Sequence, residues 1–230
     1  MTVLENIELI CNNKGYAAEE ALKAGLTKIQ VPYSKYKDIT KLYAVQLYAI
    51  SILTGFRISQ FIDYSTTDIM IDCQRAIDSI FSLPEENEKK LLSVLLCKYE
   101  KNFERIQILG KSKYMMSYND KGLSMFRRRI EHINKFLNIP RYKVLEEYDI
   151  SQHIYNGRLK ILIEKIYYMC EDVGISIDTL FSGKIINLYG ISQISTFFSP
   201  SLQLEITKLI NNYKGVSYGW TNERTNNNTR

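Results

Sequence analysis

The chain has 230 residues, which suits one large domain or two small ones and is long enough to bury a core. Hydrophobic residues make up 45% of it and charged residues 24%, which is ordinary for a globular protein and excludes wholesale disorder. The net charge of +5 is too small to indicate a nucleic-acid partner by itself.

The cysteines and histidines argue against metal or redox chemistry. Cys11, Cys73, Cys97 and Cys170 lack the paired spacing of a zinc site or a redox motif, and only two histidines are present. The chain does not begin like a signal peptide, so we expect free thiols in a cytoplasmic protein, with no cofactor. The longest apolar run, residues 42–53, is too short to cross a bilayer, so we expect no membrane partner.

Taken in chain order, the pattern predicts a mainly α fold with a small β element. We expect an N-terminal helical segment and linker over residues 1–35, a helical domain over 36–214, and a flexible polar tail over 215–230. Periodicity and capping residues predict helices over residues 19–24, 39–53, 58–64, 85–107, 123–137, 158–173 and 199–210.

Two further patterns concern the middle of the chain. Residues 68–72 (DIMID) and 77–81 (IDSIF) read as two short strands. One apolar stripe at helical spacing consists of Leu123, Phe126, Ile130, Ile133 and Leu137. Arg127, Arg128 and Arg129 are interleaved with it, and we expect them to project beside or away from it.

The basic charge is concentrated in one segment. Residues 51–100 carry a net charge of −3, whereas residues 101–143 carry eleven Lys and Arg against three acidic residues, a net of +8. Tyr114 and Tyr118 are interleaved with the lysines there. A solvated helix face is one interpretation; a surface that contacts the DNA backbone, in a salt-dependent way, is the other.

Several motifs occur in an order that resembles the catalytic domain of tyrosine recombinases, the family of phage integrases. Residues 53–68 (LTGFRISQFIDYSTTD) are similar to its first arginine motif, in which a buried helix ends in Thr-Gly-x-Arg-Ile-Ser. Residues 174–180 (GISIDTL) and 192–202 (SQISTFFSPSL) resemble its closing segment, and 121–139 stands where the family has a helix that docks on DNA. The match covers roughly residues 20–210.

The resemblance implies a phosphate contact for Arg57, since planar guanidinium groups pair well with phosphate. It also implies that the chain has lost the cutting chemistry. The nucleophile position falls on Phe197 or Phe198, which have no oxygen to attack phosphorus. The histidine of the family's Gly-His step is missing near Tyr189, and Arg75 stands near the place of the family's lysine.

We therefore expect a non-catalytic DNA-binding protein of the tyrosine-recombinase fold, acting as a repressor or accessory factor of a phage or other mobile element. Its expected partner is double-stranded DNA, and the resemblance also allows a homo-oligomer through the C-terminal helix and tail, or a protein partner. The residues expected to contact DNA are Arg57, Arg75, Lys111, Lys113, Lys121, Arg127, Arg128, Arg129, His153 and Arg158.

Three alternatives stay open at this point. An active, divergent recombinase would use a displaced tyrosine: Tyr189, Tyr213 or Tyr218. A helical HEPN ribonuclease would use Arg127 and His132, which are separated by four residues as in that family's Arg-x4–6-His motif. A purely protein-binding helical module would need no nucleic acid. No P-loop, dinucleotide-binding glycine pattern or nucleophile-elbow serine occurs in the sequence.

Overall fold

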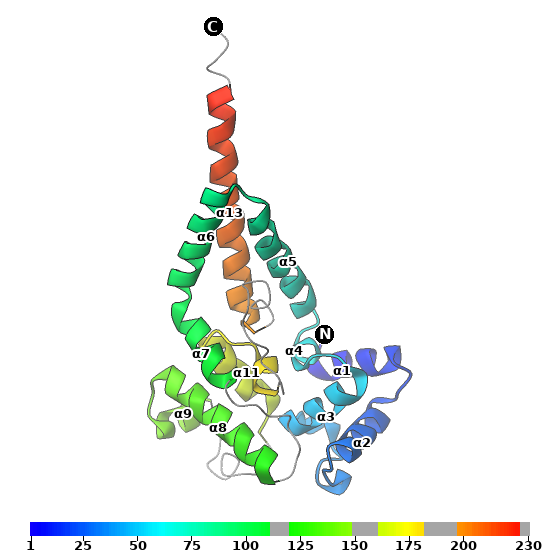
Figure 1. Ribbon diagram of the computed structural model, residues 1–230. Helices are drawn as coiled ribbons and strands as arrows, with labels where there is room; N and C mark the ends of the chain where they lie inside the picture. Colours follow the sequence, from blue (N-terminus) through cyan, green and yellow to red (C-terminus); the bar gives the residue numbers. More distant parts are fainter. Residues whose placement is uncertain (111–119, 149–160, 182–196, 226–230) are drawn as a thin grey trace.

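The computed structural model describes residues 1–110, 120–148, 161–181 and 197–225, and helices dominate these parts (Figure 1). The prediction of a mainly α protein is confirmed. The α-helices are α1 (Val3–Asn13), α2 (Ala18–Lys28), α3 (Ala44–Thr54), α4 (Ile58–Ile62), α5 (Thr66–Asp78), α6 (Glu85–Lys98), α7 (Glu100–Gly110), α8 (Asp120–Leu137), α9 (Arg141–Glu147), α11 (Ile163–Asp172), α12 (Ile177–Phe181) and α13 (Pro200–Thr225). Short 3-10 helices are η1 (Tyr33–Lys35), η2 (Ile39–Lys41) and η3 (Ser79–Ser82).

The small β element predicted near residue 70 is wrong. Both expected strands are helical. Residues 68–72 lie inside α5, and residues 77–81 span the end of α5 and most of η3. The described residues contain isolated bridges, Tyr43 with Leu162 and Ile175 with Phe198, but no strand. In α5 the buried positions, Thr66, Cys73, Ala76 and Ile77, follow helical spacing. This longer period outweighs an alternation that extends over only five residues.

Two other expectations need correction. The single helix predicted over residues 85–107 is two helices, because α6 ends at Lys98 and the buried Tyr99 separates it from α7. The polar tail predicted from residue 215 begins inside a helix, since α13 continues through Thr225. In Figure 1, α13 rises between α5 and α6 and extends beyond both.

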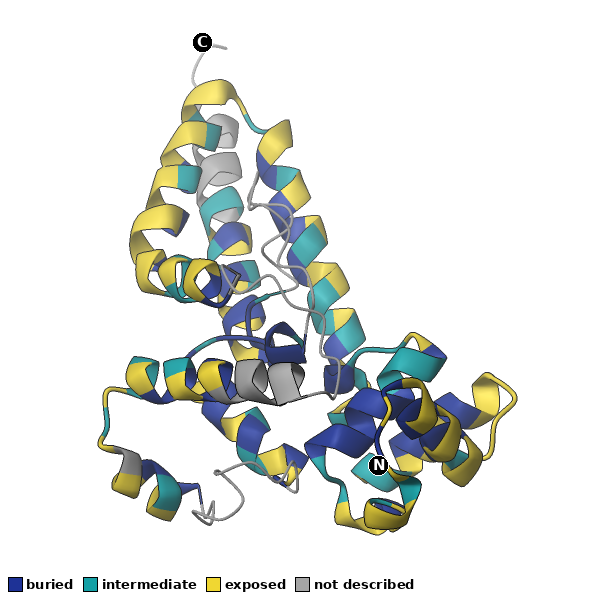
Figure 2. Ribbon diagram, turned by 60° about the horizontal axis from the view of Figure 1, so that its bottom comes forward, coloured by how far each residue is buried: buried dark blue, intermediate teal, exposed yellow. Residues whose placement is uncertain are grey.

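The N-terminal helices pack directly against α3. Gly25 of α2 lies so close to α3 that a Cβ atom there would meet the Ala49 carbonyl oxygen at 2.2 Å. Seven consecutive residues of α3, from Ala44 to Ile50, are buried, as expected of a helix that is apolar on all sides. One continuous hydrophobic core extends from Ile7 to Ile210, and buried residues line the inner faces of the helices (Figure 2). No described helix combines the length and apolar character needed to cross a membrane.

Two arginines of the basic segment are used inside the fold. Arg129 is only 3% exposed, and its guanidinium donates to the carbonyl oxygens of Thr179 (3.2 Å) and Leu180 (2.7 Å) in α12. The half-buried Arg105 of α7 donates to the carbonyl oxygens of Val173 and Phe136. Burial lowers the pKa of both guanidinium groups. Arg127–Arg129 were expected to project mostly beside or away from the apolar stripe; Arg129 instead points into the core with Ile130 and Ile133.

Replacing Arg129 by methionine should destabilise the fold by about 3 kcal/mol, because it leaves two buried carbonyl oxygens without these donors. Arg128→Met is the matched control, since Arg128 is the adjacent residue and is exposed. The free energy of unfolding, measured by urea denaturation with circular dichroism, tests the difference. Equal stabilities of the two variants would contradict the structural role of Arg129.

The thiols should differ sharply in reactivity. Cys97 is exposed, whereas Cys11, Cys73 and Cys170 are buried. Burial raises the pKa of Cys11 and of Cys73 to about 11, and raises that of Cys170 well above its ordinary value. The thiolate is the reactive form of cysteine. At pH 8, a thiol with a pKa of 11 is ionised in only about one molecule in a thousand. Alkylation should modify Cys97 alone in the native protein and all four cysteines after unfolding, and mass spectrometry identifies the modified residues. Rapid labelling of Cys11 or Cys73 in the native protein would contradict their burial in the core.

Candidate functional site

Arg57 is positioned by the tight connection between α3 and α4. Gly55 ends α3 in the left-handed conformation, with φ of 78°, and its N–H donates to the Ser51 carbonyl oxygen. The Ser51 hydroxyl donates to the Phe56 carbonyl oxygen, and the backbone N–H of Arg57 donates to Gln60 Oε1 (2.8 Å). Arg57 is thus the N-cap residue of α4, and its side chain extends into a polar pocket.

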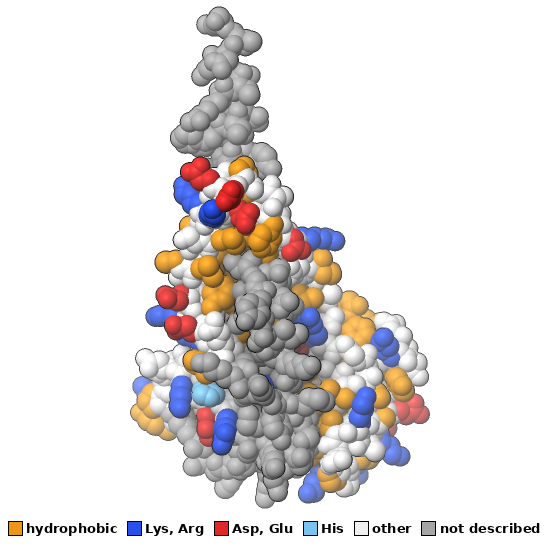
Figure 3. All heavy atoms as spheres, viewed as in Figure 1, with side chains coloured by type: hydrophobic (Ala, Val, Ile, Leu, Met, Phe, Trp, Pro, Cys, Tyr) orange, Lys and Arg blue, Asp and Glu red, His pale blue; other side chains and the backbone are white. Residues whose placement is uncertain are grey.

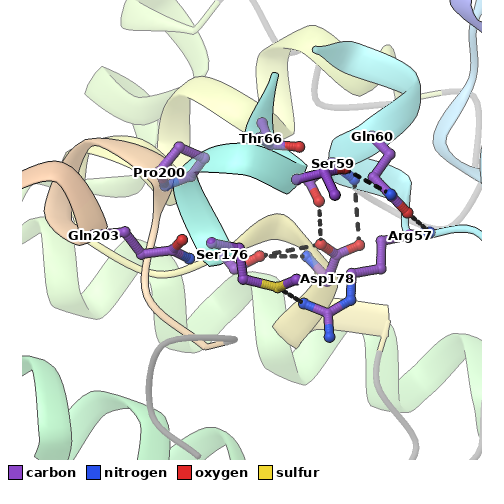
Figure 4. A pocket seen from close by; sticks show the side chains of 10 residues that line it. Arg57, Ser59, Gln60, Thr66, Ser176, Asp178, Pro200 and Gln203 are labelled. Carbon is purple, nitrogen blue, oxygen red and sulfur yellow. Dashed lines mark hydrogen bonds between the residues drawn. The ribbon is translucent and has the colours of Figure 1, made fainter. Parts of the chain in front are cut away.

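Asp178, which comes from α12, caps the start of α4 (Figure 4). Its Oδ1 accepts from the backbone N–H groups of Ile58 (2.7 Å) and Ser59 (3.3 Å). Its Oδ2 accepts from the hydroxyls of Ser59 (2.5 Å) and Ser176 (3.2 Å). A carboxylate is favourable here because free N–H groups at a helix start attract negative charge. The chain itself therefore supplies the anion at this helix end.

A small polar pocket lies between α4, α5, α12 and the start of α13, and its cavity volume of about 20 Å³ is roughly that of one water molecule. It is lined by Arg57, Ser59, Gln60, Thr66, Thr67, Met70, Ser176, Asp178, Pro200 and Gln203. The Arg57 guanidinium contacts Met70 Sδ, and among the described residues no carboxylate forms an ion pair with it.

Most other polar groups of the pocket are already paired. Gln60 donates to the Thr67 hydroxyl (2.8 Å), and Thr66 donates to the carbonyl oxygen of Asp63. Gln203 is 4% exposed, and its amide nitrogen donates to the Phe198 carbonyl oxygen (2.7 Å). Its Oε1, however, is buried without a hydrogen-bond partner in the part of the chain that the structure describes. The pocket wall therefore combines a guanidinium that forms no ion pair with the described carboxylates and a buried amide oxygen without a described partner.

Asp178 and Gln203 were not predicted as site residues from the sequence. Gln203 lies next to Leu202 and three residues before Ile206, so a polar residue on the inner face of an amphipathic helix was the available signal. Nothing local distinguishes Asp178, because its partners Ile58 and Ser59 are about 120 positions away in the sequence.

A second candidate site is the outer face of α8 and α9. Arg128, Lys135 and Lys143 are exposed there, together with the acidic Glu131, Glu146 and Glu147. Figure 3 shows basic side chains around the histidine in this region, with an acidic group among them. That histidine, His132, is half-buried and stacks on Phe136, with ring centroids 6.2 Å apart. Burial lowers the pKa of His132, and the positive charge of the nearby Lys135 lowers it further, so the neutral imidazole is favoured. Without the two internal arginines, the net charge of segment 101–143 is +6.

The remaining predicted residues do not gather around Arg57. Arg75 is exposed on α5 and pairs with Asp72 at 3.6 Å, and Arg129 is buried, so neither joins the pocket. Lys111, Lys113, Tyr114, Tyr118, His153, Arg158 and Tyr189 lie outside the described residues, as do the side chains of Lys121, Arg127 and Tyr218.

The position that the resemblance assigns to the nucleophile is used for packing. Phe198 is buried at 1% exposure and lies edge-to-face on Phe103, with centroids 5.4 Å apart. The carbonyl oxygen of the half-buried Phe197 accepts from Ser176 N–H (2.8 Å). Tyr213, one of the alternative nucleophiles, is half-buried against the core.

No protein-family model, curated protein or solved structure matches this chain. The described residues also contain no group of three or more His, Cys, Asp or Glu side chains that could hold a metal ion.

Asp178→Ala should lower the free energy of unfolding by about 2–4 kcal/mol, because two backbone N–H groups and two hydroxyls lose their acceptor. Asp178→Asn should cost less, since an amide oxygen can still accept from Ile58 N–H. Asp72→Ala, at a carboxylate that is 64% exposed, should change stability by less than about 0.5 kcal/mol. Guanidinium chloride titrations give the three values, and an Asp178→Ala as stable as Asp72→Ala would contradict the cap.

Proposed function

We propose that the protein binds double-stranded DNA through the exposed cations of α8 and α9 and does not cut it. The observation that carries this proposal is the set of exposed cations on these two adjacent helices: Arg128, Lys135 and Lys143. Contacts from such side chains to phosphates supply most of the sequence-independent affinity of DNA-binding proteins.

The face is rigidly supported, which favours a binding surface over loose surface charge. Ile130 and Ile133 anchor α8 in the core, and Val144 anchors α9. The hydroxyl of Tyr148, directly after α9, donates to Asp172 of α11. Three residues, 138–140, connect α8 to α9, a connection length typical of helix-turn-helix units.

The non-cutting part of the proposal is supported by the use of Phe197 and Phe198 in packing. The ribonuclease alternative would place His132 at an RNA surface, but its ring is half-buried and stacked on Phe136. Three parts of the proposal rest on the resemblance of residues 53–68, 174–180 and 192–202 to that family. They are the tyrosine-recombinase fold, the role as repressor or accessory factor of a mobile element, and a homo-oligomer through α13 and the tail. They belong to the proposal on that ground alone.

The DNA-binding proposal predicts a specific effect of charge removal. Replacing Arg128, Lys135 and Lys143 together by glutamine should weaken binding to a fluorescent 30-base-pair duplex at least tenfold. It should also reduce the slope of log affinity against log salt by up to about 2.7, since each lost phosphate contact contributes about 0.9. Fluorescence anisotropy at several salt concentrations measures both quantities.

A matched control removes the same charge elsewhere. Lys23, Lys41 and Lys90 are exposed and lie on α2, η2 and α6, and their triple glutamine variant should bind DNA nearly like the wild type. Equal loss in both variants would leave only a net-charge effect, and no wild-type binding at low salt would refute the proposal. The protein should form no covalent adduct with a nicked suicide substrate; an adduct abolished by Tyr213→Phe would show that it cuts.

A further inference from the structure

We infer that the outer face of α9 reads DNA sequence, with Glu146 accepting from the amino group of a cytosine and Tyr142 packing against a neighbouring base. This inference rests on the proposed function, because it assigns a role to residues that lie beside the DNA-binding cations. The two side chains are of other chemical types than those cations: a carboxylate and a phenol ring, both exposed on α9.

The short helix α9 has a buried side and an exposed side. Val144 and Tyr148, four residues apart, are buried in the core. The exposed positions are Tyr142, Lys143, Glu146 and Glu147. Residues four apart lie on the same side of a helix, so Tyr142 and Glu146 form one strip, and Lys143 and Glu147 form a second.

The place and size of α9 suit a DNA groove. Both ribbon views put it at the outer edge of the molecule, next to α8 (Figure 1, Figure 2). A helix of seven residues is about 10 Å long, and the major groove of DNA, about 12 Å wide, admits a helix. Cations are exposed on both helices: Arg128 and Lys135 on α8, and Lys143 on α9. They can hold the phosphates while the outer face of α9 meets the bases.

The acidic residues of α9 distinguish base reading from backbone binding. Glu146 and Glu147 are exposed, and neither forms an ion pair with a described cation. Phosphates repel a carboxylate, so acids weaken a surface that contacts the DNA backbone alone. The N4 amino group of cytosine, in contrast, donates to a carboxylate in the major groove. A carboxylate among phosphate-binding cations is therefore favourable where it meets a base edge.

The two strips assign different roles to these two acids. Glu147 shares its strip with Lys143, which contacts phosphate in the proposed function. Glu146 shares its strip with Tyr142, which is 61% exposed. A ring that is exposed to water gains hydrophobic free energy when it packs against a base or a thymine methyl group. The strip of Tyr142 and Glu146 thus carries two side chains suited to bases, and no cation.

The test compares sequence preference with general affinity. The full chain selects bound duplexes from a library with a randomised core, and fluorescence anisotropy on one unselected duplex gives the general affinity. The wild type should enrich a motif that contains a cytosine. Glu146→Gln should reduce the preference for this cytosine at least fivefold, which is the low end for one base contact, and should favour adenine there, since glutamine pairs with adenine.

Glu147→Gln is the matched control, because it removes the same charge one residue away. Both glutamine variants should bind the unselected duplex roughly twofold more tightly than the wild type, since each removes a repulsive charge. Only Glu146→Gln should change the motif. Tyr142→Ala should reduce the preference at a base next to the cytosine about threefold or more, whereas Tyr168→Ala, at a tyrosine of α11 that is 60% exposed, should keep the motif.

Three results would overturn the inference. They are DNA binding without enrichment of any motif, a motif that Glu146→Gln leaves unchanged, and a motif that Glu147→Gln alters as much as Glu146→Gln does. In each of them the wild type still binds the unselected duplex, so the proposed DNA binding stands. If the wild type binds no duplex at low salt, both proposals fail, and anisotropy identifies that case before any selection.

Discussion

The polar contacts of α12 connect parts of the chain that are far apart in sequence. On one side, Asp178 accepts from the first N–H groups of α4; on the other, the carbonyl oxygens of Thr179 and Leu180 accept from Arg129 of α8. The residues just before α12 pair with those just before α13, through the Ile175–Phe198 bridge and the bond from Ser176 N–H to Phe197. A helix of five residues cannot be stable alone, so these contacts and the burial of its side chains must hold it in place.

Both candidate sites depend on this junction. The polar pocket exists because Asp178 and Ser176 approach Arg57 from α12, and because Gln203 approaches from α13. The α8 face is oriented by Arg129, which is fixed to the same short helix. The basic segment therefore has two kinds of cation: internal arginines that bind carbonyl oxygens, and exposed side chains that remain available to a partner. A charge count along the sequence cannot separate them.

Elements with a strong local signal could be predicted, and those set by distant contacts could not. Gly174, with φ of 71°, ends α11 as its sequence indicates, and Pro200 begins α13 with Ser199 before it. The strands expected around residue 70 failed because five alternating residues cannot outweigh a helical stripe of thirteen. The pairing of Asp178 with Ile58 and the burial of Arg129 come from tertiary contacts that no local pattern contains. The phosphate contact of Arg57 stays a prediction, and its pocket neighbours Asp178 and Gln203 were not expected from the sequence.

Hydrogen exchange at the start of α4 tests the central claim, that α12 couples this helix to α8. The amides of Ile58 and Ser59 donate to Asp178, whereas Arg129 binds the other side of α12. In the Arg129→Met variant, mass spectrometry of peptides covering residues 56–60 should show exchange several times faster than in the wild type and in Arg128→Met. Faster exchange confined to α8 and α12, with unchanged protection at residues 58 and 59, would contradict the coupling.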